Sequence, residues 1–387
     1  MNNVVQPISI LFVIDGLEFG GGERTFLQLI QGLLYEQRYD IHVATNPEGD
    51  FFKLLTGMGI DVVPLDLKKR VNIKNIKRLS EIIRGRKINI VHSQGGRADF
   101  YARMAAKTLK PKVKLVNTVA MPVKGYDVGA LRKGFYRVFD WFSERYVDRF
   151  IVVSEVLRET LLSSYKIQPD KVIKIYNGIE LDEYRPNSKE VRSQKSEVRR
   201  EFGLTKDAPV IGAIGRMVWQ KGFEYLIECA PEIVKAFPDA KILIVGDGPL
   251  KDKLKVKSEK LKVADKIIFT GFRGDIKEIL SAIDILVIPS LLEGFPMVTL
   301  EAMAMAKPII ATNIDGITEQ ITDGVNGILV PPKNPSALAK AVIRVLNDKE
   351  TARNMGLAAR KKVEQEFSIG KMVAETEKVY LSLLKAN

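Results

Sequence analysis

The sequence predicts two α/β domains, each with a doubly wound parallel sheet facing the other across a cleft. Short apolar runs rich in Ile and Val alternate with stretches of helical periodicity, and this alternation occurs in two blocks of similar size. Alternating strands and helices favour parallel sheets covered on both faces. A chain of 387 residues is also too long for one ordinary core.

The first half is predicted to contain five strands and four helices. Its first apolar run has no basic leader and is followed at once by Asp15, which indicates a buried strand rather than a signal peptide. The predicted strands are residues 8–14, 41–45, 88–92, 114–119 and 149–153, and the predicted helices are 23–34, 73–84, 98–107 and 131–146.

The second half repeats the scheme. Its predicted strands are residues 210–214, 241–245, 266–270, 285–289, 308–312 and 328–330, and its predicted helices are 222–236, 250–261, 276–283, 296–306 and 335–346.

A polar stretch marks the boundary between the halves. The turn signal Asn177-Gly178 is followed by residues with almost no core-forming side chains. We therefore expect an N-terminal domain over 1–182, a linker over 183–199 and a C-terminal domain over 200–368. The helical stretch near 369–387 could pack back on the N-terminal domain, although periodicity alone does not show this. Ligands are expected in the cleft, outside the carboxyl ends of the strands.

Composition limits the class of protein. The chain is 46% hydrophobic and 28% charged, and no apolar run approaches the ~20 residues of a membrane-spanning helix. The single cysteine, Cys229, excludes an internal disulfide and suits a reducing cytosol. We expect a cytoplasmic protein.

The net charge of +13 is concentrated in one segment. Residues 67–114 hold fifteen Lys and Arg and only two acidic residues. Solvated helix faces would explain such an excess poorly, because acidic residues would serve equally well. We expect contact with an anionic surface, either lipid headgroups at the inner face of the membrane or a polyanionic substrate. A second basic cluster, Arg132, Lys133 and Arg137, lies among aromatic residues.

Three loops at strand ends contain residues that suit an anion. Gly20, Gly21 and Gly22 open a predicted helix, where backbone could approach a phosphate closely, although a flexible turn explains them equally well. Arg216 and Lys221 follow the predicted strand 210–214 with no acid between them, as the neutralisation of a diphosphate requires.

The third loop lies between a strand and a helix predicted to begin at Pro296. Proline is favoured at the first helical position, so Gly294 and Phe295 would present backbone N–H groups at the positive end of the helix. Carboxylates accept hydrogen bonds, so Glu293 and Glu301 suit sugar or ribose hydroxyls. Glu293 could instead be a helix cap.

Some motifs are absent from the sequence. It contains no Asp-x-Asp pair, no His/Cys/Asp cluster with metal-ligand spacing and no nucleophile elbow. We therefore expect no metal and no cofactor, with phosphate charge met by Arg, Lys and helix dipoles.

Taken together, these motifs resemble the retaining glycosyltransferases of the GT-B fold, family 4 type, nearly end to end. The resemblance rests on five motifs in order. They are Gly20-Gly21-Gly22-Glu23, Tyr176-Asn177-Gly178-Ile179, Gly215-Arg216 with Lys221-Gly222, Gly246-Asp247-Gly248-Pro249-Leu250, and the E-x₇-E stretch from Glu293 to Glu301.

The resemblance implies a nucleotide-sugar donor in the C-terminal domain. The implied catalytic residues are Arg216, Lys221 and Glu293. The implied donor-binding residues are Gly21, Gly22, Gly215, Arg216, Lys221, Gly271, Phe272, Arg273, Glu293, Gly294, Phe295 and Glu301. Among these, Arg216 and Lys221 would hold the diphosphate, Glu301 the ribose, Glu293 the sugar, and Gly271 to Arg273 would lie beside the base.

Two positions depart from the family. Ala120 stands where many members carry a histidine, and the common His-x-His is His92-Ser93-Gln94 here. We name His92 and Ala120 as acceptor contacts, and a structural role for His92 is equally compatible with the sequence.

The predicted function is transfer of one sugar from a nucleoside diphosphate to a hydroxyl of a glycan, lipid-linked or small-molecule acceptor, in cell-surface glycan or glycolipid synthesis. A GT-B sugar phosphorylase or a nucleotide-sugar epimerase remains the alternative. A basic nucleic-acid-binding module is a more distant one, and we expect no nucleic-acid partner.

Overall fold

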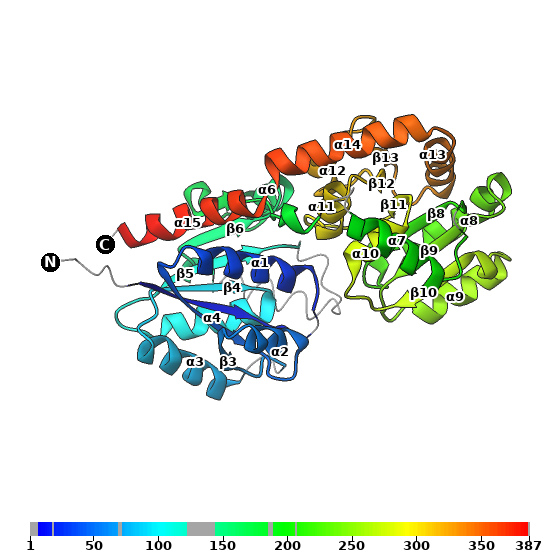
Figure 1. Cartoon of the computed structure of the whole chain (residues 1–387). Coiled ribbons are helices and arrows are strands. Elements are labelled where there is room, and N and C mark those ends of the chain that lie inside the picture. Colours follow the sequence, from blue (N-terminus) through cyan, green and yellow to red (C-terminus); the bar gives the residue numbers. More distant parts are fainter. Residues whose placement is uncertain are drawn as a thin grey trace. The chain divides into compact units, whose positions relative to one another are not determined.

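The computed structural model describes residues 7–385 except 18, 69–71, 122–143, 185–188 and 206. The chain divides into two compact units. Residues 1–178 and 369–387 form the first unit, and residues 179–368 form the second. Each unit is built around one parallel sheet with helices packed on it (Figure 1), which confirms the predicted fold class.

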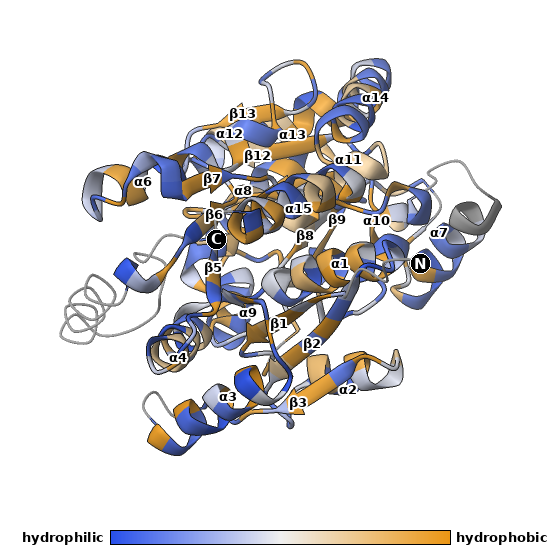
Figure 2. Cartoon of the chain, turned by 90° about the vertical axis from the view of Figure 1, so that its left-hand side faces the viewer, coloured by the Kyte–Doolittle hydropathy of each residue, from blue (hydrophilic) through white to orange (hydrophobic). Residues whose placement is uncertain are grey.

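The sheet of the first unit has seven strands in the order β3-β2-β1-β4-β5-β6-β7. Its strands are β1 (Ile8–Ile14), β2 (Tyr39–Thr45), β3 (Asp61–Pro64), β4 (Ile90–Gln94), β5 (Lys114–Val119), β6 (Arg149–Val152) and β7 (Val172–Lys174). Strand order reverses between β1 and β4, which are hydrogen-bonded neighbours. Figure 2 shows the hydrophobic colour along β1 and β2, most of whose side chains are buried.

The helices of the first unit include one from the far end of the chain. They are α1 (Gly21–Tyr35), α2 (Asp50–Gly57), α3 (Ile73–Gly85), α4 (Gly96–Lys107), α6 (Glu155–Ser164) and α15 (Ile369–Lys385). Apolar side chains of α15, including Val373 and Tyr380, join the core built on β1 and α1. Gly32 of α1 allows this close approach, because a Cβ there would lie 2.4 Å from a methyl group of Val373.

The second unit has six strands in the order β10-β9-β8-β11-β12-β13. They are β8 (Val210–Ile214), β9 (Lys241–Val245), β10 (Ile267–Gly271), β11 (Ile285–Ile288), β12 (Ile309–Thr312) and β13 (Ile328–Val330). Its helices are α7 (Lys189–Glu201), α8 (Phe223–Ala236), α9 (Lys251–Lys260), α10 (Ile276–Ala282), α11 (Met297–Ala304), α12 (Ile317–Gln320), α13 (Pro335–Asn347) and α14 (Lys349–Glu366).

The predicted linker, residues 183–199, differs in the structure. Most of it is helix α7, which belongs to the second unit and packs on α10. Arg199 fastens this helix, since its buried guanidinium donates to the Asp284 carboxylate at 2.8 Å and to the Ala282 carbonyl at 3.1 Å. Polar contacts, including the bond from Gln194 to Glu278 at 3.0 Å, thus hold a helix whose lack of an apolar stripe suggested a linker.

Five further elements were not predicted: β3, β7, α2, α6 and α12. The strands β3 and β7 form the two edges of their sheet and are short. The predicted helix 131–146 lies mostly outside the described residues, and its last part, Glu144–Tyr146, is a 3₁₀ turn.

Candidate functional site

The switch point of the second sheet lies between β8 and β11, which are paired neighbours. In open α/β sheets ligands bind outside the carboxyl ends of the strands at such a point. The loop after β8 contains Arg216 and Lys221, and the loop after β11 contains Glu293. The fold therefore brings together the two loops that the sequence singled out.

Glycines shape the loop after β8. Gly222 has a φ of +60°, and a Cβ there would lie 2.1 Å from the Pro289 carbonyl oxygen, which no side chain could tolerate. The loop is tied to its neighbours, because the Met217 amide donates to the Asp247 carbonyl at 2.7 Å. Lys221 consequently ends the 3₁₀ turn Trp219–Lys221 at a fixed place, whereas the Arg216 side chain is exposed.

Lys221 and Glu293 form an ion pair at the centre of the site. Lys221 Nζ donates to Glu293 Oε1 at 2.6 Å, and Ser290 Oγ donates to the same oxygen at 2.7 Å. The lysine side chain is 21% exposed and the glutamate side chain 4%. The backbones of the two loops are also joined, since the Leu291 amide donates to the Gln220 carbonyl at 2.7 Å. The site thus contains a half-buried cation, Lys221, paired with a more deeply buried carboxylate, Glu293.

Helix α11 begins one residue later than expected. Pro296 is its N-cap rather than its first helical residue, with φ −68° and ψ 127°. The side chain of Phe295 is buried and packs edge-on against Phe367 with centroids 5.3 Å apart. Only backbone atoms of Gly294 and Phe295 can therefore serve as the ligand contacts that the sequence suggested.

Glu301 lies inside the unit rather than on an exposed helix face. It is 2% exposed, and the Tyr184 hydroxyl donates to its Oε1 at 3.3 Å. Its apolar neighbours on α11 are buried as well, as their sequence pattern suggested.

Arg273 forms ion pairs within the second unit. Its guanidinium binds Asp275 at 2.6 and 2.7 Å and Glu201 of α7. These hydrogen-bonded carboxylates, Asp275 first, raise the pKa of Arg273 above its usual range. Gly271 has a φ of +75°, and Phe272 is 67% exposed. That this turn lies beside the base stays a prediction.

The predicted glycines Gly21 and Gly22 belong to the first unit, at its own switch point between β1 and β4. They form the first turn of α1, where the Gly20 amide donates to the Glu23 carboxylate at 3.0 Å. Burial raises the pKa of Glu23 above its usual value. A Cβ on Gly22 would lie 2.7 Å from the side-chain nitrogen of Gln94, so a larger residue there would displace the end of the Gln94 side chain.

His92 is a structural residue, which corrects its assignment as an acceptor contact. It is fully buried, with Nδ1 2.6 Å from the Tyr380 hydroxyl and Nε2 2.7 Å from the Thr118 hydroxyl. Burial lowers the pKa of His92 to about 3, so the ring is neutral. Both ring nitrogens are occupied, and none remains for a sugar. Ala120 follows the end of β5 and is half-buried.

The basic segment 67–114 is only partly a surface. Helix α3 exposes Lys74, Lys77, Arg78 and Arg84, and Ile73 at its start is 77% exposed. Arg103, in contrast, is buried and donates to the Asn117 side-chain oxygen at 3.1 Å. Residues 69–71 and the second basic cluster, within 122–143, lie outside the described residues.

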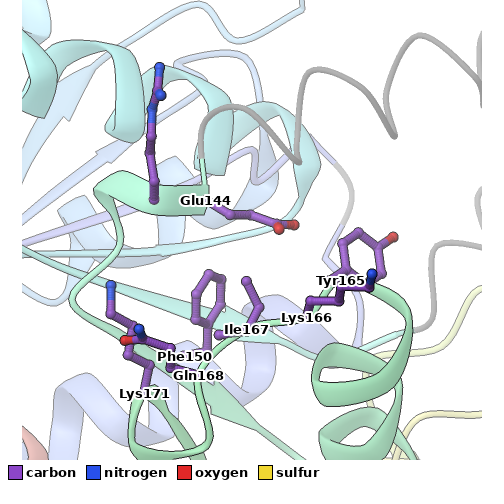
Figure 3. Close-up of a pocket in the computed structure, with 8 residues that line it drawn as sticks. Glu144, Phe150, Tyr165, Lys166, Ile167, Gln168 and Lys171 are labelled. Atoms are coloured by element: carbon purple, nitrogen blue, oxygen red, sulfur yellow. The ribbon is translucent and has the colours of Figure 1, made fainter.

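A separate hollow of about 400 Å³ lies in the first unit (Figure 3). It is lined by the short turn at Glu144 and by the loop after α6, including Tyr165, Lys166 and Lys171. No residue predicted for the site lines it.

Sequence reasoning missed two residues of the second-unit site. Ser290 directly follows the predicted strand 285–289, and its position three residues before Glu293 could have suggested a contact. Tyr184 is far from Glu301 in sequence, and no pattern relates them. Among the described residues, no group of three His, Cys, Asp or Glu side chains could hold a metal ion, and no described helix is long and apolar enough to cross a bilayer.

Both units match models of known protein families. The family models "Glycosyltransferase Family 4" and "Glycosyl transferases group 1" match residues 19–183 and 194–362. An uncharacterized glycosyltransferase of Methanocaldococcus jannaschii is 38% identical over 59% of each chain. The UDP-Gal:alpha-D-GlcNAc-diphosphoundecaprenol alpha-1,3-galactosyltransferase of Escherichia coli is 27% identical over 94% of each chain.

Solved structures agree on the fold. Anabaena HepE in complex with UDP-glucose superposes with a TM-score of 0.84 at 20% identity, over 97% of this chain and 99% of that one. The two family models lie one on each unit, and each unit has the parallel sheet that the fold requires. The chain therefore belongs to the glycosyltransferases of the GT-B fold, family 4 type.

Proposed function

We propose that this glycosyltransferase moves a sugar from a nucleoside diphosphate sugar to a hydroxyl of a glycan or lipid-linked acceptor, with retention of configuration and without a metal ion. The observation that carries the proposal is the Lys221–Glu293 pair at the switch point of the second sheet. HepE was solved with UDP-glucose, and the Escherichia coli relative is named for a UDP-sugar donor and a diphospholipid acceptor. These names support a nucleotide-sugar donor and a lipid-linked acceptor as the substrate classes.

The geometry suits departure of a diphosphate. Lys221 is held at one side by Glu293, and its remaining N–H bonds are available for phosphate oxygens, so the cation is already in place when charge develops. In the proposed reaction the bond from the anomeric carbon to the diphosphate breaks, and the acceptor oxygen forms a bond on the same face. The departing phosphate oxygen takes the acceptor proton, which needs no protein nucleophile.

The first experiment identifies the donor. A thermal-shift screen with nucleoside diphosphates and nucleotide sugars should raise the unfolding temperature with one nucleotide, because ligands that bind only the folded state stabilise it. With that donor, Lys221→Ala should lower turnover on the order of 10²–10³-fold. Lys257→Ala is the matched control, since Lys257 pairs with Glu228 on the helices α8 and α9. Equal turnover of both variants would refute the site.

Retention of configuration and independence of a metal ion are tested separately. NMR of the product should show the anomeric configuration of the donor, and EDTA should leave the rate unchanged. Formation of a sugar 1-phosphate from a glycan and inorganic phosphate would instead indicate a phosphorylase. Conversion of the nucleotide sugar in the absence of acceptor would indicate an epimerase.

We further propose a peripheral contact with the inner, anionic face of a membrane through the basic segment. The exposed cations of α3, next to the exposed Ile73, support it. Vesicles containing anionic lipid should recover more protein in flotation than neutral vesicles. Lys74→Glu/Lys77→Glu should abolish this difference, while Lys349→Glu/Lys361→Glu, on exposed positions of α14, should not. Equal recovery of the wild type with anionic and neutral vesicles would refute the membrane contact.

A further inference from the structure

Gln94 is the last residue of β4, at the carboxyl end of the first sheet. Because β4 pairs with β1, Gln94 lies at the switch point of this sheet, where ligands of open α/β sheets bind. Its side chain is only 6% exposed. Nε2 lies against the first turn of α1, since a Cβ placed on Gly22 would be 2.7 Å from it. The amide group therefore lies where α1 begins, beside the carboxyl end of β4.

The two polar residues before Gln94 in β4 are satisfied within the first unit. His92 is bonded through both ring nitrogens, and Ser93 Oγ donates to the Asp99 carboxylate at 2.7 Å. Gln94 Oε1, in contrast, is buried and has no hydrogen-bond partner among the described residues. A buried polar atom without a partner destabilises the folded state, and such atoms are rare in native proteins. An amide at this position is therefore unfavourable unless a ligand completes its hydrogen bonds.

We propose that Gln94 is a substrate-binding residue that holds a hydroxyl group of a neutral sugar ring in the acceptor. This inference rests on the proposed function, in which the donor site lies in the second unit and the first unit is left for the acceptor. A hydroxyl both donates and accepts, as the amide does, whereas an ionised phosphate only accepts and would leave Oε1 unpaired. The terminal torsion of glutamine has only a broad preference, so either end of the amide can turn towards the hydroxyl.

The first test needs no ligand. Gln94→Met replaces the amide by an apolar side chain of similar length, so it should raise the unfolding temperature by about 2–4 °C. Ser93→Ala, at the preceding residue, should lower it, because this variant removes the donor to Asp99. Gln31→Met, at an exposed glutamine of α1, should leave it unchanged. An unchanged or lower unfolding temperature of Gln94→Met would show that the amide is structural and would overturn the inference.

The second test measures binding of a neutral sugar. Methyl glycosides of glucose, galactose, mannose and N-acetylglucosamine, in both anomeric forms, are titrated by saturation-transfer NMR in the presence of UDP or GDP. At least one should bind the wild type, and inorganic phosphate should not displace it. Gln94→Met should weaken its binding about fivefold, the usual effect of one neutral hydrogen bond. Gln31→Met should bind it as the wild type does, and calorimetry should show the same nucleotide affinity in all three proteins.

The outcomes separate the role of Gln94 from the proposed function. Equal glycoside affinity in the wild type and Gln94→Met, no glycoside binding at all, or displacement by phosphate overturns the role of Gln94 and leaves the donor site intact. Loss of nucleotide affinity in Gln94→Met would assign the amide to the donor and overturn its role towards the acceptor. No binding of UDP or GDP to the wild type overturns the proposed function itself, whatever the unfolding temperatures.

Discussion

The two units share one topology but use polar side chains at their switch points differently. In the first unit His92 lies within β4, where it is fully buried and bonded to Thr118 and Tyr380. In the second unit Glu293 lies beyond the end of the equivalent strand, β11, and pairs with a half-buried lysine. A polar residue inside a strand becomes part of the core, whereas one in the loop past its end stays available for a ligand.

The largest expected difference in turnover is between substitutions of Glu293 and of His92. Glu293→Gln should lower turnover about 10²-fold, because it removes the charge that holds Lys221. His92→Gln should leave the turnover of the folded enzyme within a few fold. Steady-state kinetics at saturating donor, well below the unfolding temperature of both variants, checks this. If the histidine variant were the slower one, the contrast would be reversed and His92 would need a role in binding.

The next largest effect concerns stability of the first unit alone. Tyr380→Phe leaves the Nδ1 atom of buried His92 without its partner, which should cost about 1–3 kcal/mol. Hydrogen exchange should increase in β1 and β4 and stay unchanged in β8 and β11. Tyr225→Phe, on a half-buried tyrosine of α8, is the control in the other unit. Equal loosening of both sheets would contradict the assignment of α15 to the first unit.

The titration of His92 should appear in the pH dependence of stability. The pKa of the folded residue is lowered to about 3, whereas an unfolded histidine has a pKa of about 6.5, so on acidification the unfolded chain binds the proton first. Stability should therefore be complete above about pH 6.5 and fall towards pH 3. Between about pH 6 and pH 5 the wild type should lose up to about 1.4 kcal/mol more than His92→Gln, measured by denaturant unfolding. Parallel curves would show that His92 is not buried in the neutral form.

The smallest effect concerns Arg273, whose place beside the base stays a prediction. Arg273→Ala removes the ion pairs to Glu201 and Asp275 and should cost about 1 kcal/mol, as for well-formed pairs near a surface. Nucleotide affinity should stay within twofold of the wild type. A tenfold loss of affinity without loss of stability would place Arg273 beside the base.

The strands that decide the fold could be predicted from sequence because they are long, central and almost entirely apolar. β1 and β8 are of this kind, and their apolar pattern also predicts that the loops after them lie at one edge of each sheet. The edge strands β3 and β7 could not be predicted, because a strand with one neighbour needs few residues and little burial. Helix α7 was missed because polar contacts, such as those of Arg199 and Gln194, hold it in place and a regular apolar stripe does not.

Site residues could be predicted only where a charged side chain lies in a loop directly after a predicted strand. Lys221 and Glu293 satisfy both conditions, and the structure places them 2.6 Å apart. The ion pairs of Arg273 depend on Glu201, which is far away in sequence, so no local pattern distinguishes a ligand-binding cation from a structural one. Tyr184 and Glu301 are likewise far apart in sequence, so no local pattern predicts their contact.

The discontinuous first unit imposes an order on synthesis. The helix that supplies Tyr380 is translated only after every residue of the second unit. Until then His92 lacks one partner, and so does the Tyr39 hydroxyl, which donates to Glu377 of the same helix at 2.7 Å. All residues of the uninterrupted later unit are thus synthesised before the earlier unit receives its last helix.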